Sequence, residues 1–118
     1  MATRSLATST KRTNLILFVG TELAAADFRS GATYHNLPAE DDVIVNLPAN
    51  PASGTTVTIA STTDTKFITI QPDGSDSILY AGKGPGDTIR IDVAGANVEL
   101  VADGANGWVV TAMGGIWV

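Results

Sequence analysis

The chain has 118 residues, 44% of them hydrophobic, so a single domain can build an apolar core, and the absence of cysteine excludes disulfides and Cys-based zinc sites. Its net charge of −5 is unevenly divided, because residues 1–36 hold four basic and two acidic residues whereas residues 37–118 hold three basic and ten acidic ones. An acidic body and a sparsely basic start argue against binding to nucleic acid.

The first 36 residues differ from the rest in charge and pattern. Their longest apolar run, Leu15–Val19, is too short to span a bilayer, and no signal-peptide cleavage pattern follows the start, so we expect a soluble chain without a membrane partner. The basic start either lies on an acidic protein surface or is a solvated tail.

The remainder is a succession of short β-branched runs separated by turn residues. Such runs, at a spacing of roughly 8 to 12 residues, are typical of an all-β fold, which we expect to be an antiparallel sandwich or barrel. No long helix is predicted. About seven strands are expected, at residues 43–47, 55–59, 67–70, 77–80, 87–93, 98–101 and 108–111.

The last two of these runs flank the turn-rich segment Asp103–Gly107. Asp-Gly and Asn-Gly pairs supply the positive φ angles of a tight hairpin, so the two runs should be neighbouring antiparallel strands. In that hairpin Leu100 and Trp108 are expected in the core, with the indole N–H reaching a partner or water. The alternative is that Trp108 stacks on a sugar ring.

No motif in the chain specifies catalysis, a cofactor or a metal. The loop Gly82–Thr88 lacks the residue order of a phosphate loop, and Asp73–Ser77 lacks the calcium-loop pattern. The acidic run Glu40–Asp42 is expected to remain hydrated. His35 is the one possible imidazole base, and the sequence has no nucleophile motif to pair with it. We therefore expect a protein that is not an enzyme and uses no cofactor or metal.

The order and spacing of the body's motifs resemble a β-domain of tailed-bacteriophage virion proteins, which occurs in tail fibres and in head-fibre or capsid decoration (cement) proteins. The resemblance covers about residues 33–118, and it departs from the commonest pattern at residues 60–66. It rests on these residues: Leu47-Pro48-Ala49, Pro51, Gly54, Val57-Thr58-Ile59, Ile68-Thr69-Ile70, Asp73-Gly74, Ile89, Ile91, Val98-Glu99-Leu100-Val101, Asp103-Gly104 and Trp108-Val109-Val110.

The resemblance implies a homotrimer that binds the major capsid protein on the outer surface of the shell and is assembled in the cytoplasm of a host bacterium. Residues 1–36 would be the capsid-anchoring segment and residues 37–118 the β-sandwich trimerisation body. Alternatively, Leu15–Val19 is the first strand of the same domain and covers a sheet edge. The candidate capsid-binding residues are Arg4, Lys11, Arg12, Leu15, Leu17 and Phe18.

The apolar end of the chain is the candidate trimer interface. Because chain ends are usually polar and frayed, Ile116, Trp117 and Val118 are expected to dock, on a neighbouring subunit in preference to their own body. A carbohydrate- or receptor-binding module of a tail fibre or tailspike is the alternative function, with Trp108, Trp117 or Tyr80 as the sugar platform. A small baseplate or neck component is a third.

Overall fold

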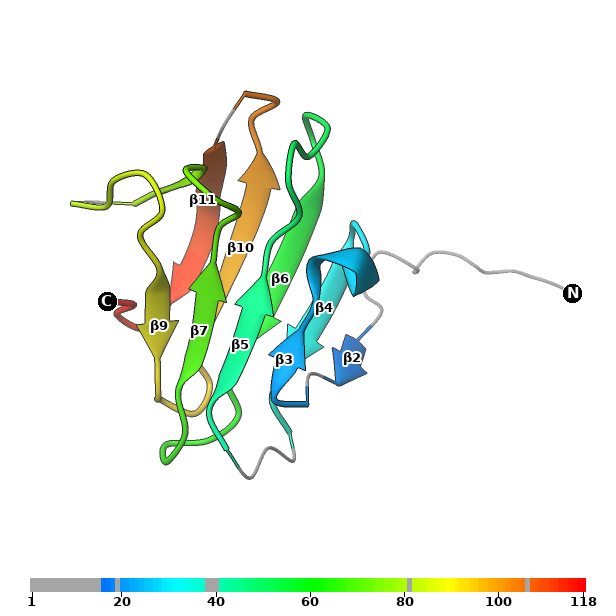
Figure 1. Ribbon diagram of the computed structural model, residues 1–118. Helices are drawn as coiled ribbons and strands as arrows, with labels where there is room; N and C mark the ends of the chain where they lie inside the picture. The colour runs from blue at the N-terminus through cyan, green and yellow to red at the C-terminus, as the bar shows by residue number, and fades with distance from the viewer. Residues whose placement is uncertain (1–15, 19, 38–40, 81, 106) are drawn as a thin grey trace, which may run out of the picture.

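The computed structural model describes residues 16–18, 20–37, 41–80, 82–105 and 107–118, which form two β-sheets packed face to face (Figure 1). The six-stranded sheet contains, in spatial order, β2 (Ile16–Phe18), β4 (Ala32–His35), β6 (Thr56–Ala60), β10 (Asn97–Ala102), β11 (Gly107–Gly114) and β8 (Ser77–Leu79). The four-stranded sheet contains β3 (Glu22–Leu23), β5 (Val43–Asn46), β7 (Ile68–Gln71) and β9 (Ile89–Ile91). A short 3-10 helix, η2 (Ala25–Asp27), follows β3.

The chain alternates between the two sheets from β2 to β10, so successive strands face each other across the core. From β2 to β7, strands two apart in sequence are neighbours in one sheet, and β2, β4 and β6 run parallel, as do β3, β5 and β7. Parallel neighbours need a crossover connection, which a helix usually supplies. Here the crossover is the intervening strand of the opposite sheet.

All seven predicted runs form strands, but the expected antiparallel arrangement was only partly right. Antiparallel pairing is confined to the later part of the described chain, where β10 joins β6 and β11 and where β7 joins β9. The count of about seven was too low, because β3 and β4 were not predicted. The alternative interpretation of Leu15–Val19 is supported by the backbone, since β2 is an outer strand beside β4.

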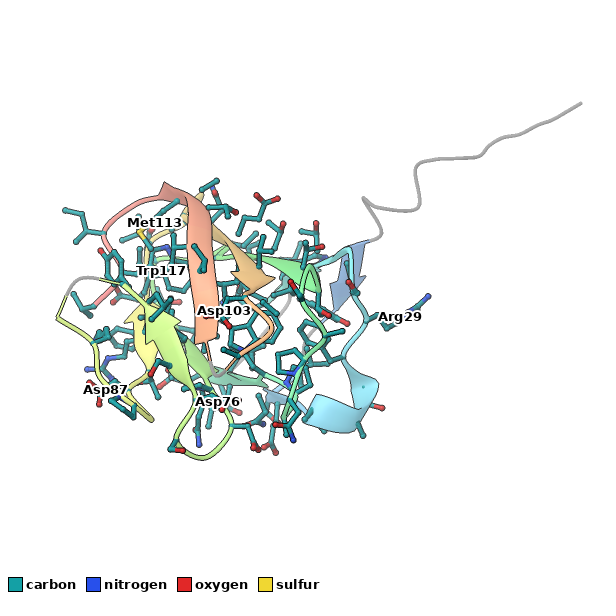
Figure 2. All side chains as sticks on the ribbon, turned by 90° about the horizontal axis from the view of Figure 1, so that it is seen from above. Arg29, Asp76, Asp87, Asp103, Met113 and Trp117 are labelled. Carbon is teal, nitrogen blue, oxygen red and sulfur yellow. The ribbon has the colours of Figure 1, made fainter. Side chains whose placement is uncertain are left out.

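Alternation along each strand divides an inner apolar face from an outer one. Val43 and Val45 of β5 point inward, as do Ile68 and Ile70 of β7, while the residues between them are more exposed. From the opposite sheet, Leu100 and Trp108 are both fully buried, which confirms their predicted core role. Side chains fill the space between the sheets when the sandwich is viewed from above (Figure 2).

The predicted hairpin joins β10 to β11. Val101 pairs with Val109, and a register shift between Glu99 and Leu100 marks a β-bulge. Asp103 Oδ1 accepts hydrogen bonds from the backbone N–H groups of Ala105 at 2.7 Å and of Gly107 at 3.2 Å, and these bonds fix the turn. Gly104 in this turn has a positive φ of 82°, as the Asp-Gly pair predicts.

The proposed boundary between residues 36 and 37 does not coincide with a break in the fold. β3 and β4 belong to different sheets, each pairing in parallel with a strand of the body. Tyr34 of β4 is fully buried, and its hydroxyl accepts the Arg29 N–H at 2.8 Å. Burial, as the largest influence, raises the pKa of Tyr34, which keeps the phenol neutral in the core.

The end of the chain folds back on its own domain. Trp117 is 1% exposed, and its Nε1 donates to the carbonyl oxygens of Asn97 at 3.1 Å and Gly114 at 3.3 Å. Gly115, with a φ of 86°, makes the turn that brings it there. The expectation that Trp117 docks on a neighbouring subunit was therefore wrong, because the indole fills the core of its own chain.

Candidate functional site

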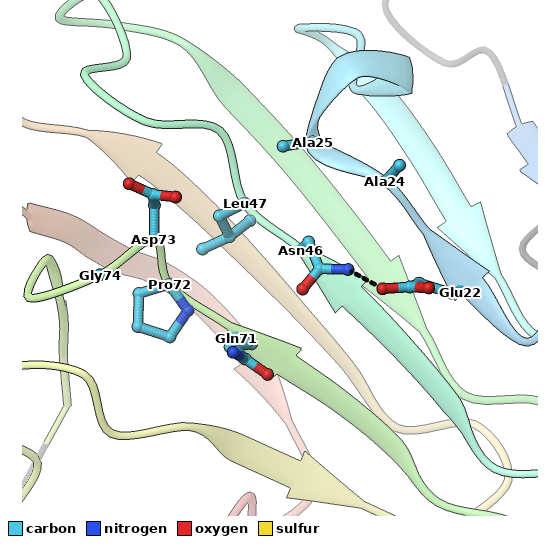
Figure 3. Close-up of a pocket in the computed structure, with 9 residues that line it drawn as sticks. All are labelled: Glu22, Ala24, Ala25, Asn46, Leu47, Gln71, Pro72, Asp73 and Gly74. Atoms are coloured by element: carbon cyan, nitrogen blue, oxygen red, sulfur yellow. Dashed lines mark hydrogen bonds between the residues drawn. The ribbon is translucent and has the colours of Figure 1, made fainter.

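The four-stranded sheet has a pocket of about 350 Å³ at one end, where β3, β5 and β7 finish (Figure 3). Because these strands are parallel, their carboxyl ends meet at the same edge, and the segments that follow them lie side by side. The lining residues are Glu22, Ala24, Ala25, Asn46, Leu47, Gln71, Pro72, Asp73 and Gly74.

The polar lining of this pocket is organised by a hydrogen bond between two strands. Asn46 Nδ2 donates to Glu22 Oε2 at 2.7 Å and to the Leu23 carbonyl oxygen at 3.2 Å, so both amide hydrogens are used. The adjacent strand contributes Gln71, which is the register partner of Asn46. With Asp73 beyond it, the pocket combines two carboxylates and two amides, and none of the described residues that line it is basic.

Sequence analysis did not identify this pocket. Asp73 was expected in a loop that lacks the calcium-loop pattern, and Glu22 was expected in a segment apart from the body. The two residues are 51 positions apart, and only the parallel order of β3, β5 and β7 brings them to one edge. The alternating pattern that predicts a strand carries no information on which strand is its neighbour.

Several acidic side chains stabilise loops, among them Asp42 of the acidic run Glu40–Asp42. Asp42 accepts the Phe67 N–H at 2.9 Å, and Asp64 accepts the Ala94 N–H at 2.6 Å. Asp87 accepts the Gly84 N–H at 2.8 Å within the glycine-rich loop. Among the residues that the structure describes, no group of three or more His, Cys, Asp or Glu side chains is placed to hold a metal ion.

His35, the one imidazole in the sequence, is half-buried at the end of β4. Its Nδ1 accepts the N–H of Leu37 at 3.2 Å, an interaction that shapes the chain as it leaves the strand. This placement gives His35 a local role in the backbone geometry.

A second surface feature is an apolar side of the sandwich, which we define by Leu79, Val93, Val109, Ile116 and Val118. Its residues lie on or next to β8, β11 and β9; β8 and β9 are the last strands of their sheets, at the edges opposite β2 and β3, and β11 is the neighbour of β8. Figure 1 shows β9 at the side of the molecule away from β3. Leu79 and Val109 are register partners that both point outward, with exposed fractions of 52% and 37%. Ile116 and Val118 at the chain end are exposed by 81% and 59%.

The predicted interaction residues have different outcomes. Arg4, Lys11, Arg12 and Leu15 lie outside the described residues, and Leu17 and Phe18 are described only as backbone of β2. Of the three candidate trimer residues, Ile116 and Val118 are exposed and Trp117 is buried.

The predicted sugar platforms are wrong for both tryptophans. Trp108 is 0% exposed and Trp117 is 1% exposed, so neither indole face can contact a sugar. Tyr80 is partly buried and packs against the core. The Nε1 atom of Trp108 is buried and has no hydrogen-bond partner in the described structure, contrary to the expectation that it reaches one.

No model of a known protein family matches the chain, and no curated protein matches it either. Within the described residues, no helix has the length and apolar character needed to cross a membrane.

Proposed function

We propose that this protein is a structural component of a phage virion, which binds the outer surface of the capsid as a homotrimer and stabilises the shell without catalysis. The proposal starts from the resemblance of the β-body to phage decoration and head-fibre domains. The observed sandwich of short strands agrees in general terms with the fold that this resemblance implies. The observation that carries it furthest is the apolar side, because exposed apolar residues concentrated on one side of a domain mark an interaction surface.

The apolar side provides a plausible surface for contacts between subunits. Five of the seven large hydrophobic residues that are exposed in the described structure belong to it, and the other two are Leu37 and Ile44. Leu79 and Val109 lie beside each other on the edge strand β8 and its neighbour β11, so a neighbouring subunit would cover both together. In a trimer, the three copies would bury against one another the apolar area that a single sandwich leaves exposed to water.

The trimer is tested by native mass spectrometry of the chain over a dilution series. We expect a trimer of the 12.2 kDa chain, and we expect the double variant Leu79→Ser, Val109→Ser to be monomeric at the same concentrations. Both side chains point outward, so this variant should keep the wild-type circular dichroism. Ile44→Ser is the matched control, since Ile44 is 39% exposed on the other sheet. A wild-type monomer at every concentration, or a trimer in the double variant, would contradict the proposal.

The capsid contact is assigned to the basic start of the chain, which contrasts with the acidic body. Charged groups in extended segments guide attachment to surfaces of opposite sign. Deleting residues 1–36 would also remove β2, β3 and β4, including the buried Tyr34, so loss of binding after that deletion could reflect unfolding. Arg4, Lys11 and Arg12 lie outside the described residues, so charge reversal there removes none of the contacts described above.

We expect the triple variant Arg4→Glu, Lys11→Glu, Arg12→Glu to lose co-sedimentation with phage capsids assembled without the protein. The affinity for the capsid should fall at least about tenfold, which corresponds to a loss of roughly 1.4 kcal/mol in the free energy of binding. Lys66→Glu with Lys83→Glu in the body is the control and should bind as the wild type does. Equal binding by the triple variant would place the contact elsewhere, and no binding by the wild type would overturn the capsid role.

A further inference from the structure

We propose that the pocket at the carboxyl ends of β3, β5 and β7 binds a neutral saccharide unit. This inference does not depend on the capsid role, since it rests on the pocket alone. Its volume of about 350 Å³ lies at the lower end of the range of small-molecule sites. Its polar groups come from three different strand ends, so the sheet holds them in fixed relative positions.

The two amides give the pocket an ordered set of donors and acceptors. Both hydrogens of Asn46 Nδ2 are used by Glu22 and the Leu23 carbonyl, which fixes the plane of the amide and leaves Oδ1 as an acceptor. In Figure 3 this oxygen is turned away from Glu22, to the side on which Gln71 lies. Gln71 supplies further donors and an acceptor from the paired position on β7.

Hydroxyl groups suit this arrangement because each both donates and accepts. A sugar hydroxyl can donate to Asn46 Oδ1 or to a carboxylate oxygen of Asp73 while it accepts from Gln71 Nε2. Neighbouring hydroxyls on one ring can therefore satisfy several of these groups together.

The apolar part of the lining matches the carbon face of a sugar. Ala24 and Ala25 line the side formed by the segment after β3, while Leu47 and Pro72 are buried at the base of the lining. A ring that packs its C–H groups on the two alanines keeps its hydroxyls directed to the polar rim. Small apolar surfaces with a few convergent polar groups are the usual composition of ligand sites.

Other ligand classes fit less well. Glu22 and Asp73 repel phosphates and carboxylates, because none of the described residues that line the pocket is basic. A metal ion would need more ligands of the right type than these two carboxylates supply. An organic cation is the strongest competitor. Its ammonium or guanidinium group can donate hydrogen bonds but cannot accept them, so it would leave the amide donors of Gln71 unpaired.

The test is a titration of the ¹⁵N-labelled full chain, followed by NMR, with glucose, galactose, mannose and N-acetylglucosamine at millimolar concentrations. At least one sugar should shift the side-chain NH₂ signals of Asn46 and Gln71 along a saturating curve. Gln71→Ala and Asp73→Ala should each weaken that binding at least about tenfold, since a lost hydrogen bond in a ligand site has effects of this size. Thr69→Ala, on the same face of β7 outside the lining, should not change it.

Two results would overturn the inference. One is the absence of saturable shifts at these signals with all four sugars. The other is saturation by methylguanidinium or methylamine alone, which would make the pocket a cation site. A chain that forms trimers and binds capsids but ignores sugars would lose only this inference, whereas one that binds a sugar but no capsid would lose only the proposed function.

Discussion

Replacing Trp108 with alanine is expected to lower the free energy of unfolding by about 3–5 kcal/mol, the usual cost of removing a buried aromatic side chain. Trp108 is fully buried, and its ring meets Phe28 edge-on at a centroid distance of 5.8 Å. The variant would leave a cavity between the hairpin strand β11 and the segment after η2. Chemical denaturation with an unchanged m-value measures the loss.

Trp108→Phe separates the packing of the ring from the polar N–H. The phenyl ring keeps an aromatic contact with Phe28 and removes a buried donor that has no partner in the described structure. An unsatisfied buried donor costs roughly 1–3 kcal/mol, so we expect Phe to lose much less stability than Ala. Thr58→Ala, on the outer face of β6, should stay within about 0.5 kcal/mol of the wild type. A loss below about 1 kcal/mol for Trp108→Ala would contradict the core role.

The positions of the strands could be predicted from the sequence because local chemistry determines them. β-branched runs such as Val43–Asn46 and Ile68–Gln71 alternate in burial as expected, and Pro48 and Pro72 follow their ends. The β10–β11 hairpin was also predictable, since its Asp-Gly turn is short and holds its own hydrogen bonds. These features depend on residues close together in the chain.

Strand order could not be predicted, because it depends on connections that cross the core. The segments 47–55 and 61–67 carry the chain from one sheet to the other, and the proline and glycine residues of the first segment are also compatible with a hairpin loop. Hence the parallel pairing of β5 with β7 was missed. The pocket was missed for the same reason, since Glu22, Asn46 and Asp73 meet only through that pairing.

The two short strands β3 and β4 escaped prediction for different reasons. β3 has two residues, Glu22 and Leu23, too few for an alternating pattern to be recognised. β4 contains Ala32, Thr33, Tyr34 and His35, a sequence without the apolar alternation that predicts a strand. Burial of Tyr34 against the aromatic ring of Phe28, with centroids 6.3 Å apart, supplies the tertiary contact that makes it a strand.

The end of the chain shows how the same residues can suggest either a subunit contact or a closed core. Ile116-Trp117-Val118 is apolar, and the sequence alone favoured a neighbouring subunit. In the structure, Val118 and Arg90 exchange two backbone hydrogen bonds of 2.8 and 2.9 Å, so the last residue covers the outer edge of β9. An exposed edge is prone to pair with other chains. The tail therefore protects an edge as well as filling the core.

Trp117→Ala is expected to cost about 3–5 kcal/mol of stability, because it removes a buried indole and leaves a cavity at the open end of the sandwich. It also deprives the carbonyl oxygens of Asn97 and Gly114 of their shared donor. Without the indole, the tail has little to hold it against β9. We therefore expect faster hydrogen exchange at the Arg90 and Val118 amides, measured together with denaturation.

Val118→Ser and Ile116→Ser are the matched controls for this variant. Both side chains are largely exposed in the single chain, and the Val118 bonds to Arg90 involve only backbone atoms. In the Leu79→Ser, Val109→Ser background, which we expect to be monomeric, each serine variant should therefore keep its stability within about 0.5 kcal/mol. If Trp117→Ala were as stable as these controls, the indole would not contribute to the core. If its stability fell while the Arg90 amide stayed protected, the edge would be held by the backbone alone, and the two roles of the tail would be separable.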